Sequence, residues 1–324
     1  MAQEIHLIAP GGVEQLRLAE REIGPPGAGE VRLRQDAIGV NFIDIYHRIG
    51  LYPLPHLPAV PGVEGAGVVE AVGEGVTSVV PGDRVAYVGA PVGGYASERL
   101  LPAARVVRLP DGIDTRTAAA AMARGLTAHM LLHRVFPVRP GTIVLVHAGA
   151  GGLGQMLSGW AKRLGAVVIA TVGSEAKIEV ARQAGADHVL LHGDPGLEAA
   201  VKQLAGGVGV DVAYDGIGGT MLRRTLGCVR PFGVVASLGQ VAGPIPPVAV
   251  EDLGPRRSIS FSRPSVMAYA NEADAYPLAA AAVFDVIAAG LCVRVGAEFP
   301  LAAAAEAQAA LEAGRTTGSI LLIP

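Results

Sequence analysis

The chain has 324 residues, of which 51% are hydrophobic, and its 26 basic and 29 acidic side chains leave a formal net charge of −3. This length is enough for about two domains, and no apolar run reaches the ~18 residues of a membrane span. The charge is nearly neutral and lacks runs of like sign, which argues against nucleic acid or an anionic membrane, so we expect a small-molecule partner.

The first 123 residues are predicted to form a compact domain of mainly antiparallel strands. Frequent Pro and Gly residues separate short extended segments at 30–40, 65–73, 82–89 and 105–110. Turn residues at this density are typical of such a domain. Residues 1–12 lack a basic region followed by a long apolar stretch. We therefore expect neither secretion nor organelle import, and a cytoplasmic location.

Residues 124–262 are predicted to form an α/β domain, and a helical segment at 118–134 leads into it. Strands at 142–147, 167–172, 188–191, 210–215 and 233–239 alternate with helices at 152–164, 175–185, 197–206 and 219–229. The strands are nearly continuous runs of Val, Ile and Leu. Such alternation is typical of a parallel sheet covered by helices on both faces. The sequence therefore predicts a doubly wound sheet of the Rossmann type.

The last segment, 263–324, is predicted to return to the first domain. A strand at 258–262 is followed by alanine-rich helices at 272–290 and 301–314 and by a closing strand that starts at Ser319. We expect this tail to pack on the N-terminal strands. The α/β domain is then an insertion within a mainly β domain.

A glycine-rich turn follows the first strand of the α/β domain. Gly149, Gly151 and Gly154 satisfy the pattern G-x-G-x-x-G where a helix begins. There the first glycine permits a tight turn, the second lets the backbone approach a pyrophosphate, and the third lets helix and strand pack closely. The helix N-terminus supplies N–H groups and a partial positive charge to the phosphates. The turn therefore predicts dinucleotide binding rather than an ordinary strand-to-helix connection.

The end of the second strand favours NADPH among the nucleotide cofactors. Methyltransferases that bind S-adenosylmethionine also begin with a glycine-rich turn. Both these enzymes and NAD enzymes usually have an acidic residue about 20 residues further on, which binds the ribose hydroxyls. Here that position is Gly173, followed by Ser174 and Lys177, a small and basic pocket that accommodates a 2′-phosphate. Glu175 keeps an alternative open. It either complements the helix dipole or binds the ribose, which would turn the preference towards NADH.

Two motifs of the N-terminal domain resemble the medium-chain dehydrogenase/reductase superfamily. They are G39-V-N-F-I-D44 and P61-G-V-E-G-A-G67. The zinc-dependent alcohol dehydrogenases of that superfamily have a cysteine ligand in the first and G-H-E in the second, where this chain has Asn41 and Val63. Only Glu64 has a counterpart, and one carboxylate cannot build a tetrahedral zinc site. The resemblance implies a metal-free enzyme with a GroES-like substrate domain.

Within that superfamily the chain resembles the quinone oxidoreductase group, the zeta-crystallin-like NADPH:quinone reductases. The motifs that carry this resemblance occur in order as G39-V-N-F-I-D-I-Y-H-R-I-G-L-Y-P53, A123-R-G-L-T-A128, A148-G-A-G-G-L-G154, V172-G-S-E-A-K177, Y214-D-G-I-G218 and S262-R-P-S265. The match runs essentially from end to end. It implies that NADPH binds in a cleft between two domains and reduces quinones or related conjugated carbonyls.

Carried over residue by residue, the resemblance implies a set of site residues. It places Asn41, Tyr46 and Tyr52 around the nicotinamide and the substrate as catalytic hydrogen-bond donors. The residues expected on the cofactor or lining its cleft are Thr127, Gly151, Gly152, Leu153, Gly173, Ser174, Lys177, His192, Ile217, Leu238, Gly239, Arg263 and Arg315. His192 stands where the group usually has tyrosine. From the residues alone, Asn41 can equally support a turn, and the two tyrosines can be rim aromatics.

Three hypotheses about function follow from these patterns. The first is NADPH-dependent reduction of a quinone without zinc. The second keeps the cofactor but reduces the C=C bond of an enal or enone, with hydride going to the β-carbon and a proton to the α-carbon. The third, from a different class, is a non-catalytic NADPH-binding protein. The resemblance also implies a homodimer, formed through the unpaired sheet edge near residues 258–262.

Overall fold

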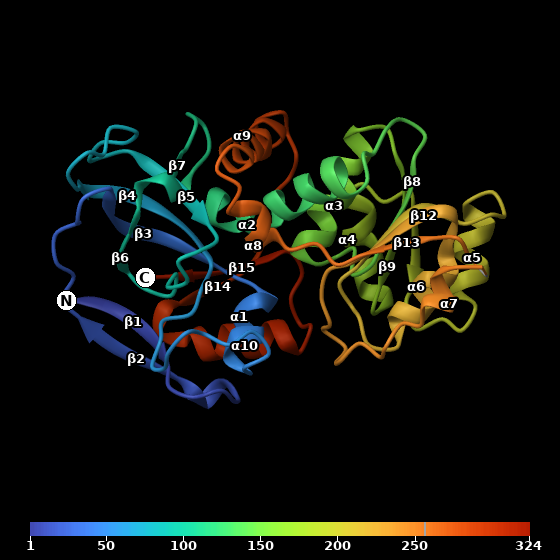
Figure 1. Cartoon of the computed structure of the whole chain (residues 1–324), viewed down its shortest axis with the longest axis horizontal. Coiled ribbons are helices and arrows are strands. Elements are labelled where there is room, and N and C mark those ends of the chain that lie inside the picture. Colours follow the sequence, from blue (N-terminus) through green and yellow to red (C-terminus); the bar gives the residue numbers. More distant parts are fainter. Residues whose placement is uncertain (256) are drawn as a thin grey trace. The chain divides into compact units, whose positions relative to one another are not determined.

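The structure of the chain is a computed structural model that describes residues 1–255 and 257–324. It divides into two compact units, one of Met1–Leu126 with Val266–Pro324 and one of Thr127–Ser265 (Figure 1). The first unit thus consists of two chain segments, and the second is a continuous insertion. The functional domain boundaries predicted after residues 123 and 262 lie near these divisions and stay a prediction.

The first unit is built on a seven-stranded sheet and a separate hairpin. The sheet order is β14, β15, β3, β4, β5, β7, and β6 also pairs with β3. The strands are β3 (Glu30–Val40), β4 (Glu64–Val72), β5 (Arg84–Val88), β6 (Glu98–Pro102), β7 (Val107–Arg108), β14 (Val295–Pro300) and β15 (Ser319–Ile323), with β1 (Ala2–Leu7) and β2 (Leu16–Arg21) forming the hairpin. The four strands predicted for the N-terminal domain are confirmed as β3, β4, β5 and β7.

The C-terminal tail enters this sheet through β15. It runs antiparallel to β3 and pairs Ile320 with Val40 and Leu322 with Ile38. These four side chains are buried in one hydrophobic cluster with Leu301. The predicted return of the tail to the N-terminal strands is therefore confirmed. The sequence did not predict β14 or the β1–β2 hairpin, because β14 buries no residue completely and β2 buries only its first.

Five helices lie wholly or, in the case of α2, largely in the first unit. They are α1 (Phe42–Arg48), α2 (Thr115–His129), α8 (Val266–Ala270), α9 (Ala275–Ala288) and α10 (Ala304–Glu312), and three short 3-10 turns are η1 (Val13–Gln15), η2 (Ala103–Arg105) and η5 (Leu301–Ala303). The buried side chain of Arg48 fixes α1 against α10, since it donates to Gln308 over 2.9 Å and pairs with Glu312 over 2.7 Å. The helix predicted at 118–134 is α2 continued by a π-helical segment, η3 (Met130–Val135).

The second unit is a doubly wound parallel sheet in the order β10, β9, β8, β11, β12, β13. Its strands are β8 (Ile143–Val146), β9 (Val167–Val172), β10 (His188–Leu191), β11 (Val210–Asp215), β12 (Val229–Ser237) and β13 (Ser260–Ser262). Its helices are α3 (Gly152–Arg163), α4 (Ile178–Gln183), α5 (Leu197–Leu204), α6 (Met221–Cys228) and α7 (Val250–Leu253), and the 3-10 turn η4 (Glu175–Lys177) precedes α4. The fold class predicted from the sequence is confirmed.

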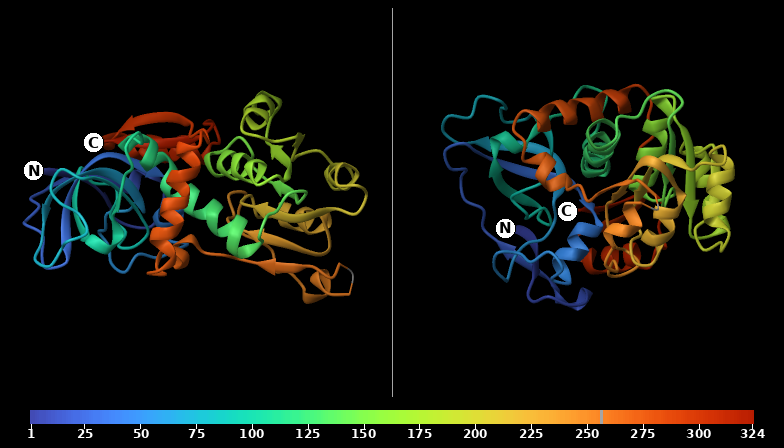
Figure 2. Two further views of the ribbon diagram at one scale, coloured as in Figure 1. Left: turned by 90° about the horizontal axis from the view of Figure 1, so that it is seen from above. Right: turned by 45° about the vertical axis from the view of Figure 1, so that its right-hand side comes forward.

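The strand order places a topological switch point between β8 and β11. From β8 the strands are added in one direction to β10, and from β11 in the other direction to β13 (Figure 1). Ligands of such sheets bind at the carboxyl ends of the strands beside this point. The orange strand β13 ends the sheet on one side (Figure 2). Within residues 1–255 and 257–324, no helix is long and apolar enough to cross a membrane.

Candidate active site

The glycine-rich turn joins β8 to α3 in the second unit. A side chain at Gly154 would place its Cβ 2.3 Å from the carbonyl oxygen of Ala148. A Cβ at Gly149 would lie 2.7 Å from the methyl group of Ala170 in β9. Both positions therefore need glycine for α3 to pack against its strands. Gly151 is the N-cap of α3, and the first N–H groups of this helix have no acceptor within it, so they can bind phosphate oxygens.

The next turn, after β9, carries the predicted 2′-phosphate residues. Gly173 is exposed, and a Cβ added to it would lie 3.1 Å from the ring of His192. The buried Nδ1 of His192 has no hydrogen-bond partner in the described part of the chain. Burial lowers the pKa of His192, and the charges of Arg224 and Lys177 lower it further. Ser174 lies at the N-cap of η4, and Glu175, the first residue of η4, is exposed.

The turns after β11 and β12 lie against each other. The buried Oδ1 of Asp215 accepts the backbone N–H groups of Ile217 and Gly218 over 2.8 and 3.0 Å. Gly218 has a positive φ of 68°, and a Cβ there would lie 2.7 Å from the carbonyl oxygen of Gly239. Arg263, after β13, donates to the hydroxyl of Ser237 over 2.9 Å. The structure thus brings the turns after these three strands together.

The predicted cofactor residues of the second unit lie, with one exception, after the carboxyl ends of its parallel strands. These residues are Gly151, Gly152, Leu153, Gly173, Ser174, Lys177, His192, Ile217, Leu238, Gly239 and Arg263. Thr127 is the exception, because it lies in α2. Arg315 belongs to the first unit, where it is exposed just after α10. Their contacts with the cofactor stay a prediction.

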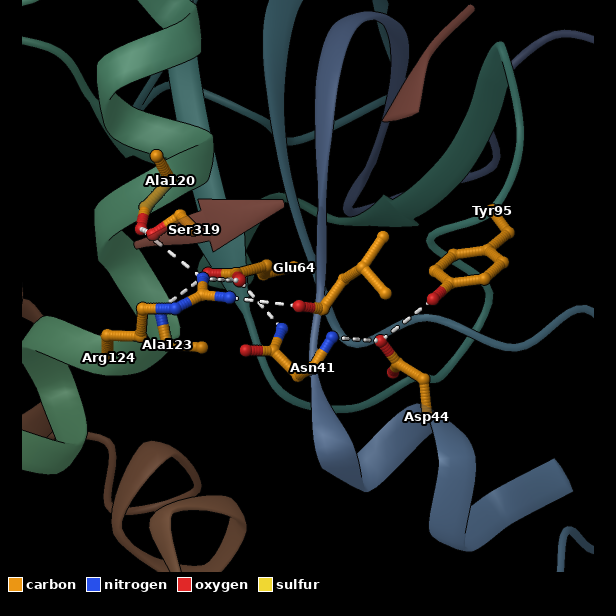
Figure 3. A network of polar contacts seen from close by, with 9 residues as sticks. Asn41, Asp44, Glu64, Tyr95, Ala120, Ala123, Arg124 and Ser319 are labelled. Carbon is orange, nitrogen blue, oxygen red and sulfur yellow. Dashed lines mark hydrogen bonds and ion pairs between the residues drawn. The ribbon is translucent and has the colours of Figure 1, made fainter. Parts of the chain in front are cut away.

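A buried carboxylate organises the candidate site of the first unit (Figure 3). Glu64, at the start of β4, is fully buried. Its Oε1 accepts from the amide Nδ2 of Asn41 over 2.7 Å and from Nη1 of Arg124 over 2.9 Å. Its Oε2 accepts the backbone N–H of Ala123 over 2.6 Å. Arg124 also donates to the carbonyl oxygen of Val40 over 2.9 Å, so the charge of each partner is compensated.

This arrangement makes Glu64 an ion-pair partner of Arg124. Both of its oxygens are occupied by donors, and the guanidinium of Arg124 lies beside it. Among the described residues, no three His, Cys, Asp or Glu side chains cluster as metal ligands would. Arg124 lies in the motif A123-R-G-L-T-A128, but nothing in its spacing relates it to Glu64, so the sequence did not predict its role.

The three predicted catalytic donors lie on or beside α1. Asn41 is the N-cap of this helix, and its amide donates to Glu64 on β4. Tyr46 is buried and Tyr52 exposed, and their rings meet edge to face with centroids 5.4 Å apart. The structure brings these two tyrosines together. Contacts of all three residues with nicotinamide or substrate stay a prediction.

Asp44 is a second buried carboxyl group next to this site. Its Oδ2 accepts the backbone N–H of Asn41 over 2.8 Å and the hydroxyl of Tyr95 over 3.1 Å (Figure 3). Its Oδ1 has no hydrogen-bond partner among the residues that the structure describes. Burial raises the pKa of Asp44 to about 7, although both hydrogen bonds lower it. This carboxyl group therefore exchanges its proton near neutral pH.

Comparisons with known proteins match both parts of this architecture. The alcohol dehydrogenase GroES-like domain family matches residues 27–111, and the family described as zinc-binding dehydrogenase matches residues 152–283. A 2-haloacrylate reductase from Burkholderia sp is 42% identical over all of this chain and 99% of its own. A quinone oxidoreductase from Pseudomonas aeruginosa is 41% identical over the full length of both chains.

A solved structure supports the same relationship. The crystal structure of Escherichia coli quinone oxidoreductase complexed with NADPH is 37% identical, covers 99% of this chain and all of its own, and gives a TM-score of 0.96. The fold and the two domain matches define the class of the protein, that of the medium-chain dehydrogenases and reductases. Within this class, the chain belongs to the quinone oxidoreductase family. The resemblance noted in the sequence is confirmed.

We expect the substitution Asp44→Asn to remove a pH dependence of stability. The folded carboxyl group keeps its proton up to about pH 7, whereas an unperturbed one loses it near pH 3.8, so the folded state binds more protons between these values. The stabilisation of the folded state by the protonated Asp44 is fully present below pH 3.8. It is lost as the pH rises through 7, which lowers the free energy of unfolding by about 4 kcal/mol at most. Urea unfolding between pH 5 and 8 measures this as a growing advantage of the variant over the wild type.

The control is Asp111→Asn, because the side chain of Asp111 is fully exposed. Its stability should differ from that of the wild type by the same small amount at every pH. A difference for Asp44→Asn that is equally independent of pH would show that the buried carboxyl group is ionised throughout.

Proposed function

We propose that this chain is an NADPH-dependent, zinc-free reductase of quinones. The observation that carries the proposal is the edge of the second unit's sheet beside the switch point. There the close-packed glycine turn follows β8, and Lys177 and His192 follow β9 and β10 without an acid at Gly173. This donor set suits a dinucleotide with a 2′-phosphate. The relative from Escherichia coli was solved in complex with NADPH, which supports the same cofactor here.

The residues present fit NADPH on three counts. The N-terminus of α3 offers free N–H groups to the pyrophosphate. Lys177 supplies a positive charge for the 2′-phosphate. The Nδ1 of His192, buried and without a described partner, is a polar atom that a ligand can satisfy. The exposed position of Glu175 agrees with a role at the helix N-terminus and supports NADPH over NADH.

The chemistry follows from the donors of the first unit. NADPH, when bound, supplies a hydride, which carries two electrons to the quinone, and one proton completes the hydroquinone. A quinone is already electrophilic, so hydrogen bonds to its oxygen can replace a Lewis acid. Tyr46 and Tyr52 are suited to donate them, since each carries a phenolic hydroxyl. Asn41 keeps one amide N–H for a ligand after its bond to Glu64.

A second candidate is the reduction of an activated C=C bond. The observation that favours it is the 42% identity to a 2-haloacrylate reductase over the whole chain. Such a reaction adds hydride to the β-carbon and a proton to the α-carbon, so it needs a proton donor close to carbon. The phenolic hydroxyls of Tyr46 and Tyr52 are chemically able to serve this reaction also.

We also propose that the protein is a homodimer in the cytoplasm. The edge strand β13 has β12 on one side only, and an unpaired edge is a template for a second copy. Next to it, Phe232 is 82% exposed and donates its N–H to the carbonyl oxygen of Ser258 over 2.7 Å. The exposed ring of Phe232 would therefore be available to a second copy that pairs with this edge. The cytoplasmic location agrees with a reaction that consumes NADPH.

Turnover with a panel of acceptors tests the reaction itself. We expect the purified protein to oxidise NADPH with 1,4-benzoquinone and 9,10-phenanthrenequinone, measured as the loss of absorbance of the reduced nicotinamide. Crotonaldehyde and 2-chloroacrylate are the matched acceptors for C=C reduction. Activity with these two alone would replace the quinone proposal by the second candidate. NADPH binding without turnover of any acceptor would place the chain in the non-catalytic class.

The cofactor preference is tested by Lys177→Ala. Loss of a charge-assisted contact to the 2′-phosphate should raise the dissociation constant of NADPH roughly 10- to 100-fold and leave that of NADH nearly unchanged. The control is Lys202→Ala, because Lys202 is exposed on α5 in the same unit. Equal losses for both cofactors would refute the phosphate contact. A loss of NADH affinity in Glu175→Ala would instead assign the ribose to Glu175.

The dimer is tested by Phe232→Asn. Phe232 has a positive φ of 63°, which Asn tolerates better than a bulky residue, so the substitution removes the aromatic surface without straining the fold. We expect the molar mass measured by light scattering to fall from the dimer to the monomer while the circular dichroism stays the same. Val80→Asn, an exposed apolar position of the first unit, should remain dimeric. A monomeric wild type, or a dimeric Phe232 variant, would contradict this interface.

A further inference from the structure

Four buried polar side chains of the second unit form a continuous chain of hydrogen bonds. The hydroxyl of Thr171 lies 2.8 Å from Nδ1 of His147, and Nε2 of His147 lies 2.9 Å from the hydroxyl of Thr225. The same hydroxyl of Thr225 lies 2.8 Å from Oδ2 of Asp215. His147 is 4% exposed and the other three are completely buried. The chain thus joins β9, the start of the glycine turn, α6 and the end of β11.

The direction of each bond follows from the available protons. An ionised Asp215 only accepts, so Thr225 donates its single proton to Oδ2, which is nearer than the other acceptor, the carbonyl oxygen of Met221 at 3.1 Å. Thr225 must then accept from Nε2 of His147, which leaves Nδ1 to accept from Thr171. Every group is satisfied only if His147 is neutral with its proton on Nε2.

The surroundings of His147 agree with the neutral form. Burial lowers the pKa of His147, and the charges of His192 and Arg224 act in the same direction, while Asp215 opposes them. A protonated imidazole would present two donors and leave the hydroxyl of Thr171 without its acceptor. The neutral ring is therefore the form that holds the chain together.

Each end of the chain reaches a turn that the proposed cofactor uses. Thr171 lies two residues before Gly173, and its carbonyl oxygen accepts the N–H of Gly149 over 2.8 Å. At the other end, Oδ1 of Asp215 holds the N–H groups of Ile217 and Gly218. One set of hydrogen bonds thus connects the glycine turn, the 2′-phosphate turn and the turn after β11, which follow three adjacent strands of the sheet, β8, β9 and β11.

We propose that His147 is a positioning residue for the dinucleotide, which sets the three cofactor turns relative to one another through Thr171, Thr225 and Asp215. It does not touch the reacting atoms. The inference rests on the proposed function, because it requires that these turns bind a nicotinamide cofactor. Loss of these hydrogen bonds should therefore lower the affinity for the cofactor and raise its KM. It should leave kcat at saturating cofactor nearly unchanged.

The experiment removes the hydrogen bonds on either side of His147 with substitutions of nearly equal shape. Thr171→Val removes the donor to Nδ1, and Thr225→Val removes the acceptor of Nε2–H together with the donor to Asp215. We expect each to raise the dissociation constant of NADPH about five- to tenfold at 25 °C, the effect of roughly one lost hydrogen bond. The double variant should lose little more than Thr225→Val alone, because the chain acts as one unit. Thr225→Ser keeps the hydroxyl and should restore binding to within about twofold.

The matched control is Ser158→Ala. Ser158 is a completely buried residue of α3 whose hydroxyl has no hydrogen-bond partner in the described ranges, so its loss should leave NADPH binding unchanged. Thermal unfolding measured on every variant separates folding from binding, and the two Val variants on different elements guard against one of them failing to fold.

The outcomes separate this inference from the proposed function. Suppose that the wild type binds NADPH and reduces quinones, but both Val variants bind NADPH as tightly as the wild type. The hydrogen bonds of His147 then only stabilise the fold, and the positioning role is wrong. The same conclusion follows if Thr225→Ser is as impaired as Thr225→Val. If the wild type binds neither NADPH nor NADH, the proposed function fails and the positioning role fails with it.

Discussion

The first unit depends on the compensation of one buried charge, the carboxylate of Glu64. Taking this group out of water is costly unless it is paired and hydrogen-bonded, and here it receives donors from Asn41, Ala123 and Arg124. Because these donors come from segments far apart in the sequence, satisfying the charge fixes where β4, α2 and the start of α1 lie. Gly39 belongs to the same constraint, since a Cβ there would lie 2.0 Å from Oε1 of Glu64.

This pairing also shapes the chemistry that the site can support. The charge of Glu64 is balanced by the guanidinium of Arg124, and burial raises the pKa of Asp44 nearby to about 7. The proposed substrate site therefore presents hydrogen-bonding groups on and beside α1, next to a paired carboxylate. Such a site suits an acceptor that is electrophilic by itself, such as a quinone or another conjugated system, and it agrees with the family to which the chain belongs.

In the second unit, the main constraint is that backbone groups must come close to an anionic cofactor. Gly149 and Gly154 permit the contact between α3 and its strands because a Cβ at either position would overlap a neighbouring atom. The turns that follow β8, β9 and β11 are then connected by the buried hydrogen bonds of His147. In this unit close packing brings the backbone into reach, and a directional set of hydrogen bonds relates one turn to the next.

The sequence by itself determined the fold class, the glycine turn and the absence of an acid at Gly173, because these depend on local periodicity and on spacing along the chain. It also indicated the family and the loss of zinc ligands at Asn41 and Val63. Only the tertiary structure decided what Glu64 does, because Arg124 lies 60 residues further on in the sequence and no spacing relates the two. The same holds for Asp44 and His147. Their roles arise from burial and from partners on other elements, and no periodic pattern in the sequence indicates these.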